Sequence, residues 1–368
     1  MPDARPMRHV AVVYGVIHAI IDATTVSVLF ATQAIHDLTP QDGFALVLAY
    51  DLVAFGSQFL VGLMTDRFRA PRGVVLAGIL YSALGAALVS VEPITAVVLV
   101  SVGNALFHVG ASVFALSVEP GRATSAGLFV APGALGLGFG LWFGKTAVFI
   151  QWPFQLALAA SFAMAWILRG PELPYTKPDD GRASSVSLPG LVVGLLLVSV
   201  AVRSFVGMAG CYTCPRELLV MLGLPLCAFA GKAVGGFVAD KLGWIVTGVG
   251  ALLVSAPLIA FGAGHPIVVL AGLLFFQMTM PVTLVAVTVV HPRRPGFAFG
   301  LTCLALVLGS LPTFVEEVHD FYGPPLFLAL ILASTAALYA GLRRLPVGHL
   351  ATDTRPGATA RLESRPLP

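Results

Sequence analysis

Charge is the property that this sequence has least of. Only 11% of its 368 residues are Asp, Glu, Lys or Arg, whereas a soluble domain carries about 25%. Hydrophobic residues make up 57% of the chain, and its mean hydropathy is +0.92. A chain so poor in charge cannot cover a soluble surface, so the composition indicates an integral membrane protein.

Cysteine is scarce, and several catalytic motifs are absent. The four cysteines, Cys211, Cys214, Cys227 and Cys303, are too few for a disulfide framework. No G-x-x-x-x-G-K-[ST] nucleotide loop, H-E-x-x-H motif or hydrolase serine motif occurs. These absences argue against ATP-driven transport within this chain and against an enzyme. We expect no cofactor, no resident metal and no nucleic-acid partner.

Long apolar runs fill the rest of the chain. A helix needs about 20 apolar residues to cross a bilayer, and twelve segments meet this length approximately. An even number of spans places both ends of the chain on one side of the membrane. The predicted segments are 9–34, 43–65, 73–91, 94–118, 123–145, 147–169, 188–210, 217–239, 245–263, 266–290, 297–318 and 325–342.

The basic residues predict which side that is. Of the 21 Lys and Arg residues, 17 fall before the first segment, after the last one, or in the even-numbered loops between them. Short cytoplasmic loops carry such an excess of Lys and Arg. We therefore expect a multi-pass protein of a prokaryotic cytoplasmic membrane with both termini in the cytoplasm.

The chain divides into two halves. The polar stretch 170–187, rich in Pro, Gly and Ser, is typical of a flexible linker. We expect a six-helix bundle over 1–169, the cytoplasmic linker 170–187, a second six-helix bundle over 188–344, and a disordered cytoplasmic tail over 345–368.

The two halves also resemble each other in sequence. FLVGLMTDR (59–67) aligns with AVGGFVADK (233–241), which pairs Gly62 with Gly236, Asp66 with Asp240 and Arg67 with Lys241. SVEPGR (117–122) aligns in the same way with VVHPRR (289–294). Two copies of one unit predict a binding site between the halves near the midplane, and transport by rocking of one half against the other.

The stretch GLMTDRFRAPR (62–72) resembles the signature G-x-x-x-D-[RK]-x-G-R-[RK] of the major facilitator superfamily, with Arg69 where the signature has glycine. This resemblance implies an all-α integral membrane fold of twelve transmembrane helices in two pseudo-symmetric six-helix bundles. It also implies a cytoplasmic gate. Its expected residues are Gly62, Asp66 and Arg67, with Gly236, Asp240 and Lys241 in the second half. The alternative is that Asp66 and Arg67 are surface charges that only set the topology.

Two further stretches resemble the fosmidomycin-resistance subgroup of this superfamily. They are His18-x-x-x-Asp22 in the first segment and GNALFHVGAS (103–112) in the fourth. The resemblance implies an exporter, most simply a proton antiporter. The glycine-rich run 126–144 resembles a stretch found in the superfamily's antiporters without keeping its Gly-Pro order. Close helix packing explains such glycines equally well, so they do not indicate a direction.

Four polar residues are predicted near the middle of the membrane in the first half. His18 and Asp22 lie about 14 and 20 Å into their helix, where an ionisable group costs roughly 2.5 to 3.5 kcal/mol. They are candidates for proton coupling and substrate binding, or for a hydrogen bond that locks two helices together. Asn104 and His108 share one helix face and are candidates for substrate or proton contact. The alternative for His108 is a satisfied core histidine.

Three more charged residues are predicted within the core. Arg203 needs a carboxylate or a substrate anion, and Lys232 lies one helix further along the chain. Asp51 is a third candidate for proton coupling. Structural ion pairs of Asp22 and Asp51 with Arg203 and Lys232 account for these residues as well as a substrate site does.

The predicted function is a proton-coupled secondary active transporter of a small polar or anionic solute, acting by alternating access, with export favoured by the subgroup resemblance. One alternative is an importer of a transition metal or an organic acid. Cys211, Cys214 and Met208 together with His18 and His108 suit soft metals, and the two cysteines could equally form a disulfide. A second alternative is a sensor or assembly protein that no longer transports. The expected partners are a small-molecule substrate, protons and membrane lipid, and we expect a monomer.

Overall fold

Every regular element in the described part of the chain is helical. The computed structural model describes residues 7–145, 149–175, 186–213 and 217–346. The elements are α1 (Arg8–Ile35), α2 (Pro40–Asp51), the π-helical turn η1 (Leu52–Gly56), α3 (Gln58–Phe68), α4 (Pro71–Leu88), α5 (Pro93–Val118), α6 (Ala123–Gly144), α7 (Trp152–Ile167), α8 (Pro189–Thr213), α9 (Leu218–Leu242), α10 (Trp244–Phe261), α11 (Pro266–Gln277), α12 (Thr279–Val290), α13 (Pro295–Ser310), the 3-10 turns η2 (Leu311–Phe314) and η3 (Glu316–Phe321), and α14 (Pro324–Leu342).

The helices are long and apolar enough for a membrane protein. In the described ranges, eleven helical segments could cross a bilayer by length and composition, and Trp152–Ile167 is a shorter apolar helix. The predicted all-helical membrane fold is therefore confirmed. The predicted span 147–169 is shorter than expected, because α7 has only 16 residues.

Proline explains many of the boundaries. Seven helices (α2, α4, α5, α8, α11, α13 and α14) begin with proline, whose missing N–H costs nothing at the first helical position. Within a helix the same residue has the opposite effect. Pro281 offers no N–H to the carbonyl of Gln277, and the predicted span 266–290 is divided at that point into α11 and α12.

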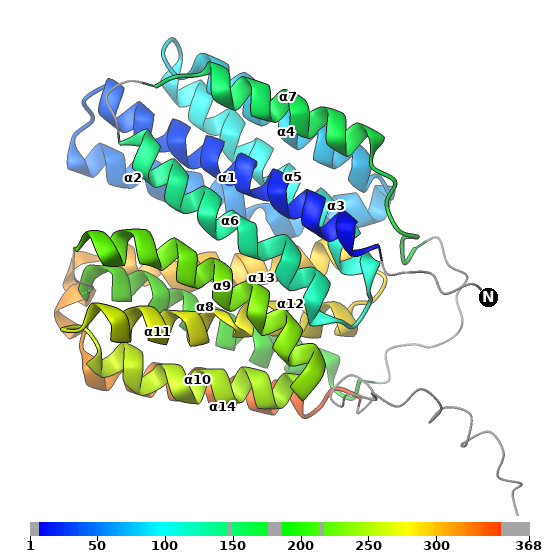
Figure 1. Ribbon diagram of the computed structural model, residues 1–368, viewed down its shortest axis with the longest axis vertical. Coiled ribbons are helices and arrows are strands. Elements are labelled where there is room, and N and C mark those ends of the chain that lie inside the picture. Colours follow the sequence, from blue (N-terminus) through cyan, green and yellow to red (C-terminus); the bar gives the residue numbers. More distant parts are fainter. Residues whose placement is uncertain (1–6, 146–148, 176–185, 214–216, 347–368) are drawn as a thin grey trace, which may run out of the picture.

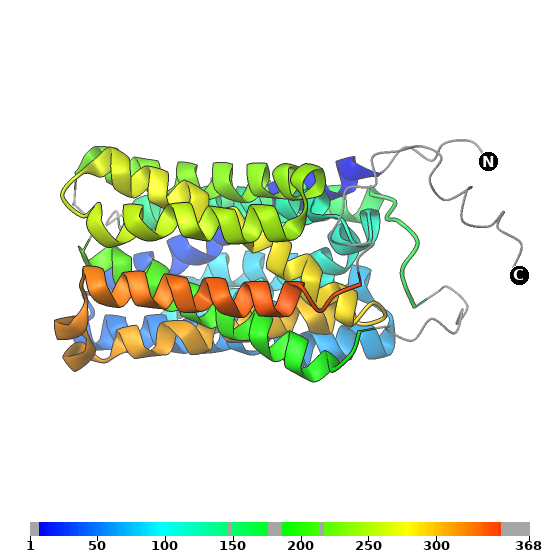
Figure 2. The ribbon, with the colours of Figure 1, turned by 90° about the horizontal axis from the view of Figure 1, so that it is seen from below.

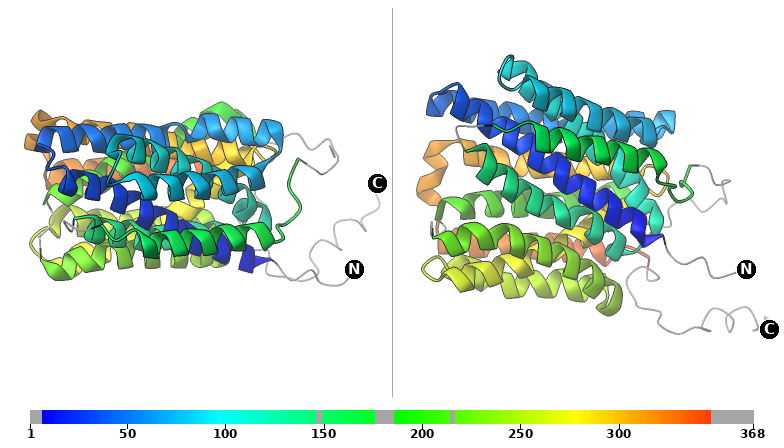
Figure 3. Two further views of the ribbon diagram at one scale, coloured as in Figure 1. Left: turned by 90° about the horizontal axis from the view of Figure 1, so that it is seen from above. Right: turned by 45° about the horizontal axis from the view of Figure 1, so that its top comes forward.

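The helices form two groups that face each other. Figure 1 shows α1–α7 above and α8–α14 below. The groups meet mainly where α6 packs on α9 and where α3 packs on α13. Within the first group, α1 lies along α6 (Figure 3). Because α1 begins and α14 ends at the same end of the molecule (Figure 2), we call this the terminus end and the opposite one the far end.

Candidate functional site

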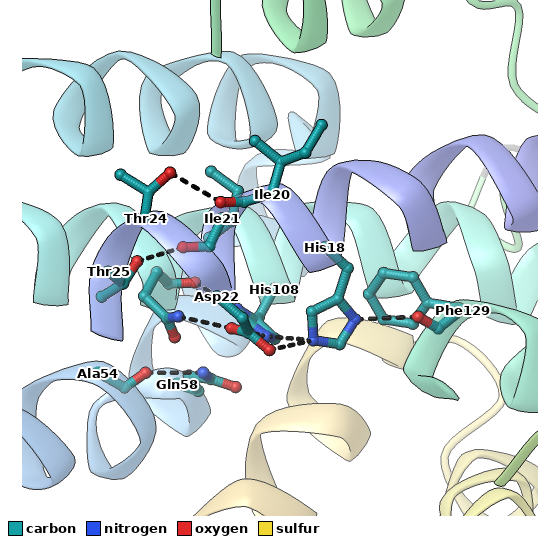
Figure 4. Close-up of polar contacts among 11 residues, drawn as sticks. His18, Ile20, Ile21, Asp22, Thr24, Thr25, Ala54, Gln58, His108 and Phe129 are labelled. Atoms are coloured by element: carbon teal, nitrogen blue, oxygen red, sulfur yellow. Dashed lines mark hydrogen bonds and ion pairs between the residues drawn. The ribbon is translucent and has the colours of Figure 1, made fainter. Parts of the chain in front are cut away.

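Three ionisable side chains from two helices meet in the middle of the first group. His18 and Asp22 come from α1 and His108 comes from α5 (Figure 4). The Nε2 atoms of the two imidazoles are 2.7 Å apart. One carboxylate oxygen of Asp22 lies 3.1 Å from Nε2 of His18, and the other lies 3.4 Å from Nε2 of His108. All three residues are buried, with exposed fractions of 6%, 2% and 4%. We call them the His–Asp–His cluster.

Backbone carbonyls fix how the two imidazoles carry their protons. Nδ1 of His18 is 2.9 Å from the carbonyl oxygen of Phe129 in α6, and Nδ1 of His108 is 2.8 Å from that of Asn104. A carbonyl oxygen only accepts, so each Nδ1 must donate. In its neutral form, each imidazole therefore presents a bare lone pair at Nε2.

The two bare Nε2 atoms cannot face each other unaided at 2.7 Å. A single proton between them turns this repulsion into a hydrogen bond of ordinary length. A second proton would put two N–H groups head to head at the same separation. Asp22 lies beside both nitrogens and neutralises the charge that the proton brings. This arrangement therefore has room for one shared proton between the two Nε2 atoms.

Neighbouring residues hold the cluster in place. The amide of Asn104 donates to Asp22 over 3.1 Å. Gly133 of α6 lies so close that a Cβ there would collide with His18 and stand 2.7 Å from a carboxylate oxygen of Asp22. Phe299 of α13 stacks on His108 with ring centroids 6.5 Å apart, so the second group of helices covers the cluster. Sequence analysis did not identify Gly133, although it lies in the glycine-rich run.

A π-helical turn lies beside the cluster. η1 brings the ring of Phe55 to 6.1 Å from that of His108, and such turns are frequent at functional sites. Three buried polar atoms on the surrounding helices have no hydrogen-bond partner: the amide oxygens of Asn104 and Gln58 and the hydroxyl of Tyr50. Figure 4 shows the amide of Gln58 donating to the carbonyl of Ala54, which leaves its amide oxygen without a partner. The polar groups here are therefore not fully matched, and a donor-bearing molecule could satisfy them.

Arg203 has a different environment from the one expected. Its guanidinium donates to the hydroxyls of Thr279 and Thr283, the second over 2.9 Å, and its Nε donates to the carbonyl of Ser199 over 3.2 Å. In the described part of the chain it forms no ion pair with Asp22 or Asp51, so the structural alternative of such a pair is not seen. The helix break before Thr279 places a hydroxyl there instead.

Asp51 and Lys232 are half-buried, and among the described residues neither has a hydrogen-bond or ion-pair partner. Arg203 and Lys232 are therefore cations within the C-terminal half that no described carboxylate pairs with.

Two equivalent contacts hold the halves together at the terminus end. Asp66 of α3 accepts the backbone N–H groups of Gly296 and Phe297, over 3.2 and 2.8 Å, at the start of α13. Asp240 of α9 accepts those of Ala123 and Thr124, both over 2.8 Å, at the start of α6. A carboxylate at a helix N-terminus is favourable because it meets unpaired N–H groups and the positive end of the helix dipole. We call these the Asp66 latch and the Asp240 latch.

Glycine makes both latches possible. A Cβ at Gly62 would collide with the backbone of Gly296, and one at Gly236 would lie 2.6 Å from the carbonyl oxygen of Ala123. Arg67 and Lys241, the remaining expected gate residues, follow the two aspartates at the ends of α3 and α9, and neither forms an ion pair with a described carboxylate.

A salt bridge supports the Asp240 latch only. Glu119 accepts two hydrogen bonds from Arg8, each over 2.9 Å, and one from Ser125 over 2.7 Å. Burial raises the pKa of Glu119, but these hydrogen bonds outweigh it and hold its pKa below the ordinary value. Glu119 therefore stays ionised and neutralises the charge of Arg8.

The possible metal-binding groups are only partly described. The ligand atoms of the His–Asp–His cluster lie within 4.8 Å of one another, and this is the one group of three or more such residues in the described ranges. Cys214 and the side chain of Cys211 lie outside the described residues, so the expected disulfide or metal site there stays a prediction. Met208 is 39% exposed and lies on α8.

The comparisons with known proteins found matches among solved structures. No protein-family model matches the chain, and no curated protein matches its sequence. A crystal structure of a variant of the E. coli fucose:proton symporter FucP matches with a TM-score of 0.67 at 12% identity, covering 93% of this chain and 100% of that one. A second, of FucP as a major facilitator superfamily transporter in the outward conformation, gives 0.61 at 13% identity, covering 91% and 100%. The chain therefore has the fold of these transporters, a fold of multi-pass membrane proteins.

Proposed function

From the fold that the chain shares with major facilitator transporters, we propose that the protein is a proton-coupled secondary transporter of a small polar or anionic solute. The observation that carries this proposal is the contact between Nε2 of His18 and Nε2 of His108, 2.7 Å apart beside Asp22. An arrangement that needs one proton for its own stability can bind and release that proton as water reaches it from alternate sides.

Two cations of the second half, Arg203 and Lys232, support the proposal that the solute is an anion. Arg203 is 7% exposed and has hydroxyl and carbonyl partners but no described carboxylate. A buried guanidinium without a counter-charge is costly. Its forked donors match a carboxylate or phosphate, and Lys232 adds a second positive charge. An organic acid fits this pair best.

Contacts between the two halves at both ends of the molecule are compatible with alternating access, in which one end opens at a time. The two latches close the terminus end, and at the far end the rings of Phe44 and Phe314 meet with centroids 4.8 Å apart. We propose that the terminus end faces the cytoplasm, as the Lys and Arg distribution predicts. The moving parts are then the bundles 1–169 and 188–344, joined by the linker 170–187. Residues 176–185 of the linker and 347–368 of the predicted tail lie outside the described residues.

A transition metal is the second candidate solute, since the cluster offers two imidazoles and a carboxylate within reach of one another. The separation of the imidazoles favours a shared proton over a shared metal ion. Two nitrogens bound to one tetrahedral ion at about 2.0 to 2.1 Å stand about 3.3 Å apart, whereas the Nε2 atoms here are 2.7 Å apart. The observed separation suits a shared proton better than a shared metal ion.

The direction of transport rests on two similarities that disagree. The subgroup resemblance of His18-x-x-x-Asp22 and GNALFHVGAS favours export in exchange for protons, whereas the structural neighbour FucP is named as a symporter. We propose export as the working hypothesis. A non-transporting sensor would not need costly titratable groups at mid-depth, so we place it last.

Reconstitution in liposomes tests the proposal. The purified protein is placed in vesicles with an internal pH dye and supplied with a panel of organic acids and neutral polar solutes. A solute gradient should drive proton movement in the wild type, and Asp22→Asn should abolish it because the cluster loses its negative charge. Protons that move against the solute indicate antiport, and protons that move with it indicate symport.

Asp37→Asn is the matched control. Asp37 is an exposed acid in the left-handed region, with φ of 46°, a conformation that asparagine adopts readily. It should leave proton movement unchanged. Equal proton movement in Asp22→Asn and the wild type would remove Asp22 from the mechanism and overturn the proposal.

A further inference from the structure

A second site lies at the terminus end, away from the His–Asp–His cluster. It is a cavity of about 520 Å³ lined by seven residues, a volume within the range of small-molecule sites. Four of them are arginines and only one is an acid. We call this cavity the basic pocket; its lining residues are Leu63, Asp66, Arg67, Arg69, Tyr175, Arg293 and Arg294.

The pocket bridges the two halves of the chain. Arg67 lies in α3 and Arg69 directly follows it, whereas Arg293 and Arg294 lie in the connection from α12 to α13. The only carboxylate in the lining, Asp66, is already occupied by the backbone N–H groups of Gly296 and Phe297. None of Arg67, Arg69 and Arg294 forms an ion pair with a described carboxylate. Among the residues that line the pocket, positive charges therefore outnumber negative ones.

Arg69 adopts a backbone conformation that suits glycine. Its φ and ψ are 56° and 35°, in the left-handed region, which costs an L-residue roughly 1 to 2 kcal/mol. In the repeat alignment its counterpart is Gly243, which also has a positive φ of 91°. The first half thus places a guanidinium where the second half keeps an unstrained glycine. Such strain is typical of ligand-binding positions.

The loops of the other latch lack this excess of charge. In the alignment of SVEPGR with VVHPRR, Gly121 is the counterpart of Arg293 and Glu119 is the counterpart of His291. Beside the Asp240 latch, Glu119 pairs with Arg8 over 2.9 Å. The two equivalent latches therefore differ in charge, because the Asp66 latch has arginines at two glycine positions and His291 in place of Glu119.

Tyr175 supplies an independent sign of a missing ligand. Its hydroxyl is buried and has no hydrogen-bond partner, although such groups are nearly always paired. It lines the same pocket as the four arginines. A bound anion with several acceptor oxygens would satisfy this donor and the guanidinium groups together.

We propose that the basic pocket binds a phosphate-bearing anion, which ties Arg67 and Arg69 to Arg293 and Arg294 across the two halves. Phosphate fits better than a single carboxylate, because a tetrahedral group with several charged oxygens accepts from guanidinium forks on more than one side. The phosphate belongs either to a soluble molecule or to a lipid head group. This proposal does not depend on the transport function, since it concerns binding alone.

Thermal unfolding of the full-length purified protein tests it in two arms. In lipid-free neutral detergent, inorganic pyrophosphate is titrated at constant ionic strength. In nanodiscs, phosphatidylcholine alone is compared with phosphatidylcholine containing phosphatidic acid. We expect a saturable rise of the unfolding temperature in at least one arm, and that arm identifies the source of the phosphate.

Arg69→Gly and Arg72→Gln are the decisive pair of variants. Arg69→Gly should weaken the response about tenfold, because it removes charged hydrogen bonds, yet the ligand-free protein should be at least as stable, since the strain is relieved. Arg72 is exposed over the ring of Trp166, 5.8 Å from its centroid, and does not line the pocket. Arg72→Gln should leave the response unchanged. Equal weakening by both variants, or no saturable response in either arm, would overturn the proposal.

Discussion

At the scale of single residues, the surroundings of Asp22 illustrate how an ionisable group persists in an apolar interior. Asp22 has two imidazoles and the Asn104 amide as partners, and each imidazole is oriented by a backbone carbonyl. The cost of burial is offset by this set of partners together with one proton. The cost of burying the guanidinium of Arg203 is offset less completely, because its described partners are uncharged.

The first residue-scale prediction concerns Arg203. Arg203→Gln should weaken the binding of anionic solutes by about tenfold or more, since hydrogen bonds to charged groups are worth roughly 1.5 to 3 kcal/mol. It should have little effect on the binding of neutral solutes. Arg203→Lys, which keeps the charge without the fork, should fall between the two. Inhibition constants for matched anionic and neutral solutes give the measurement, and equal losses for both classes would indicate a purely structural Arg203.

The second residue-scale prediction concerns Gly133. Gly133→Ala should push the ring of His18 away from His108, because the added methyl group occupies its place. Solute-driven proton movement should fall at least about tenfold, the effect expected for a misplaced proton-transfer group. Gly250→Ala is the control, since nothing lies within 4 Å of a Cβ there. Normal proton movement in Gly133→Ala would show that the imidazole contact is not required.

At the scale of helices, irregular elements bring the polar residues together. The π-helical turn η1 places Phe55 against His108, and the break between α11 and α12 places Thr279 against Arg203. Kinks and breaks in membrane helices are tolerated where they line a site. The latches are also properties of elements, because each depends on the free N–H groups at the start of a helix.

The helix-scale prediction concerns these latches. Asp240→Ala should weaken the closed terminus end, because two backbone N–H groups and the hydroxyl of Thr124 lose their acceptor. The expected loss is about 1 to 3 kcal/mol. Distances between spin labels on the terminus-end tips of α6 and α9 should then become longer and broader. Asp37→Asn serves again as the control, and an unchanged distance distribution in Asp240→Ala would argue against a gating role.

At the scale of the whole molecule, the two halves enclose the His–Asp–His cluster and carry opposite chemical roles. In the function that we propose, the first half contributes the proton-binding groups, and the second contributes Arg203, Lys232 and the covering ring of Phe299. Contacts between the halves at both ends leave the cluster buried. A rocking motion that breaks the contacts at one end at a time would expose the cluster to alternate sides of the membrane.

The whole-molecule prediction concerns orientation. After the four native cysteines are replaced by serine, single cysteines are introduced at Ala70 at the terminus end and at Gly264 at the far end, both exposed positions. In intact cells a membrane-impermeant thiol reagent should label Gly264→Cys and spare Ala70→Cys, because the basic loops are expected in the cytoplasm. Lysed cells should label both. The reverse pattern in intact cells would contradict the predicted topology.

The sequence by itself determined the membrane-spanning helical fold. Apolar runs of sufficient length and the repeat around Asp66 and Asp240 can be recognised in the sequence without knowing how the helices pack. The same signals singled out His18, Asp22, His108 and Arg203, since a charged group within an apolar run is costly wherever the helix packs.

Only the tertiary structure decided which of these residues meet. The 2.7 Å contact of His18 with His108, the role of Gly133 and the pairing of Arg203 with threonines all depend on how α1, α5, α6, α8 and α12 pack. For the same reason the sequence left open whether Arg203 pairs with Asp22 or Asp51, and the structure shows no such pair among the described residues. Sequence spacing fixes neighbours along one helix, but partners on different helices are set by close packing, which leaves no spacing signal in the chain.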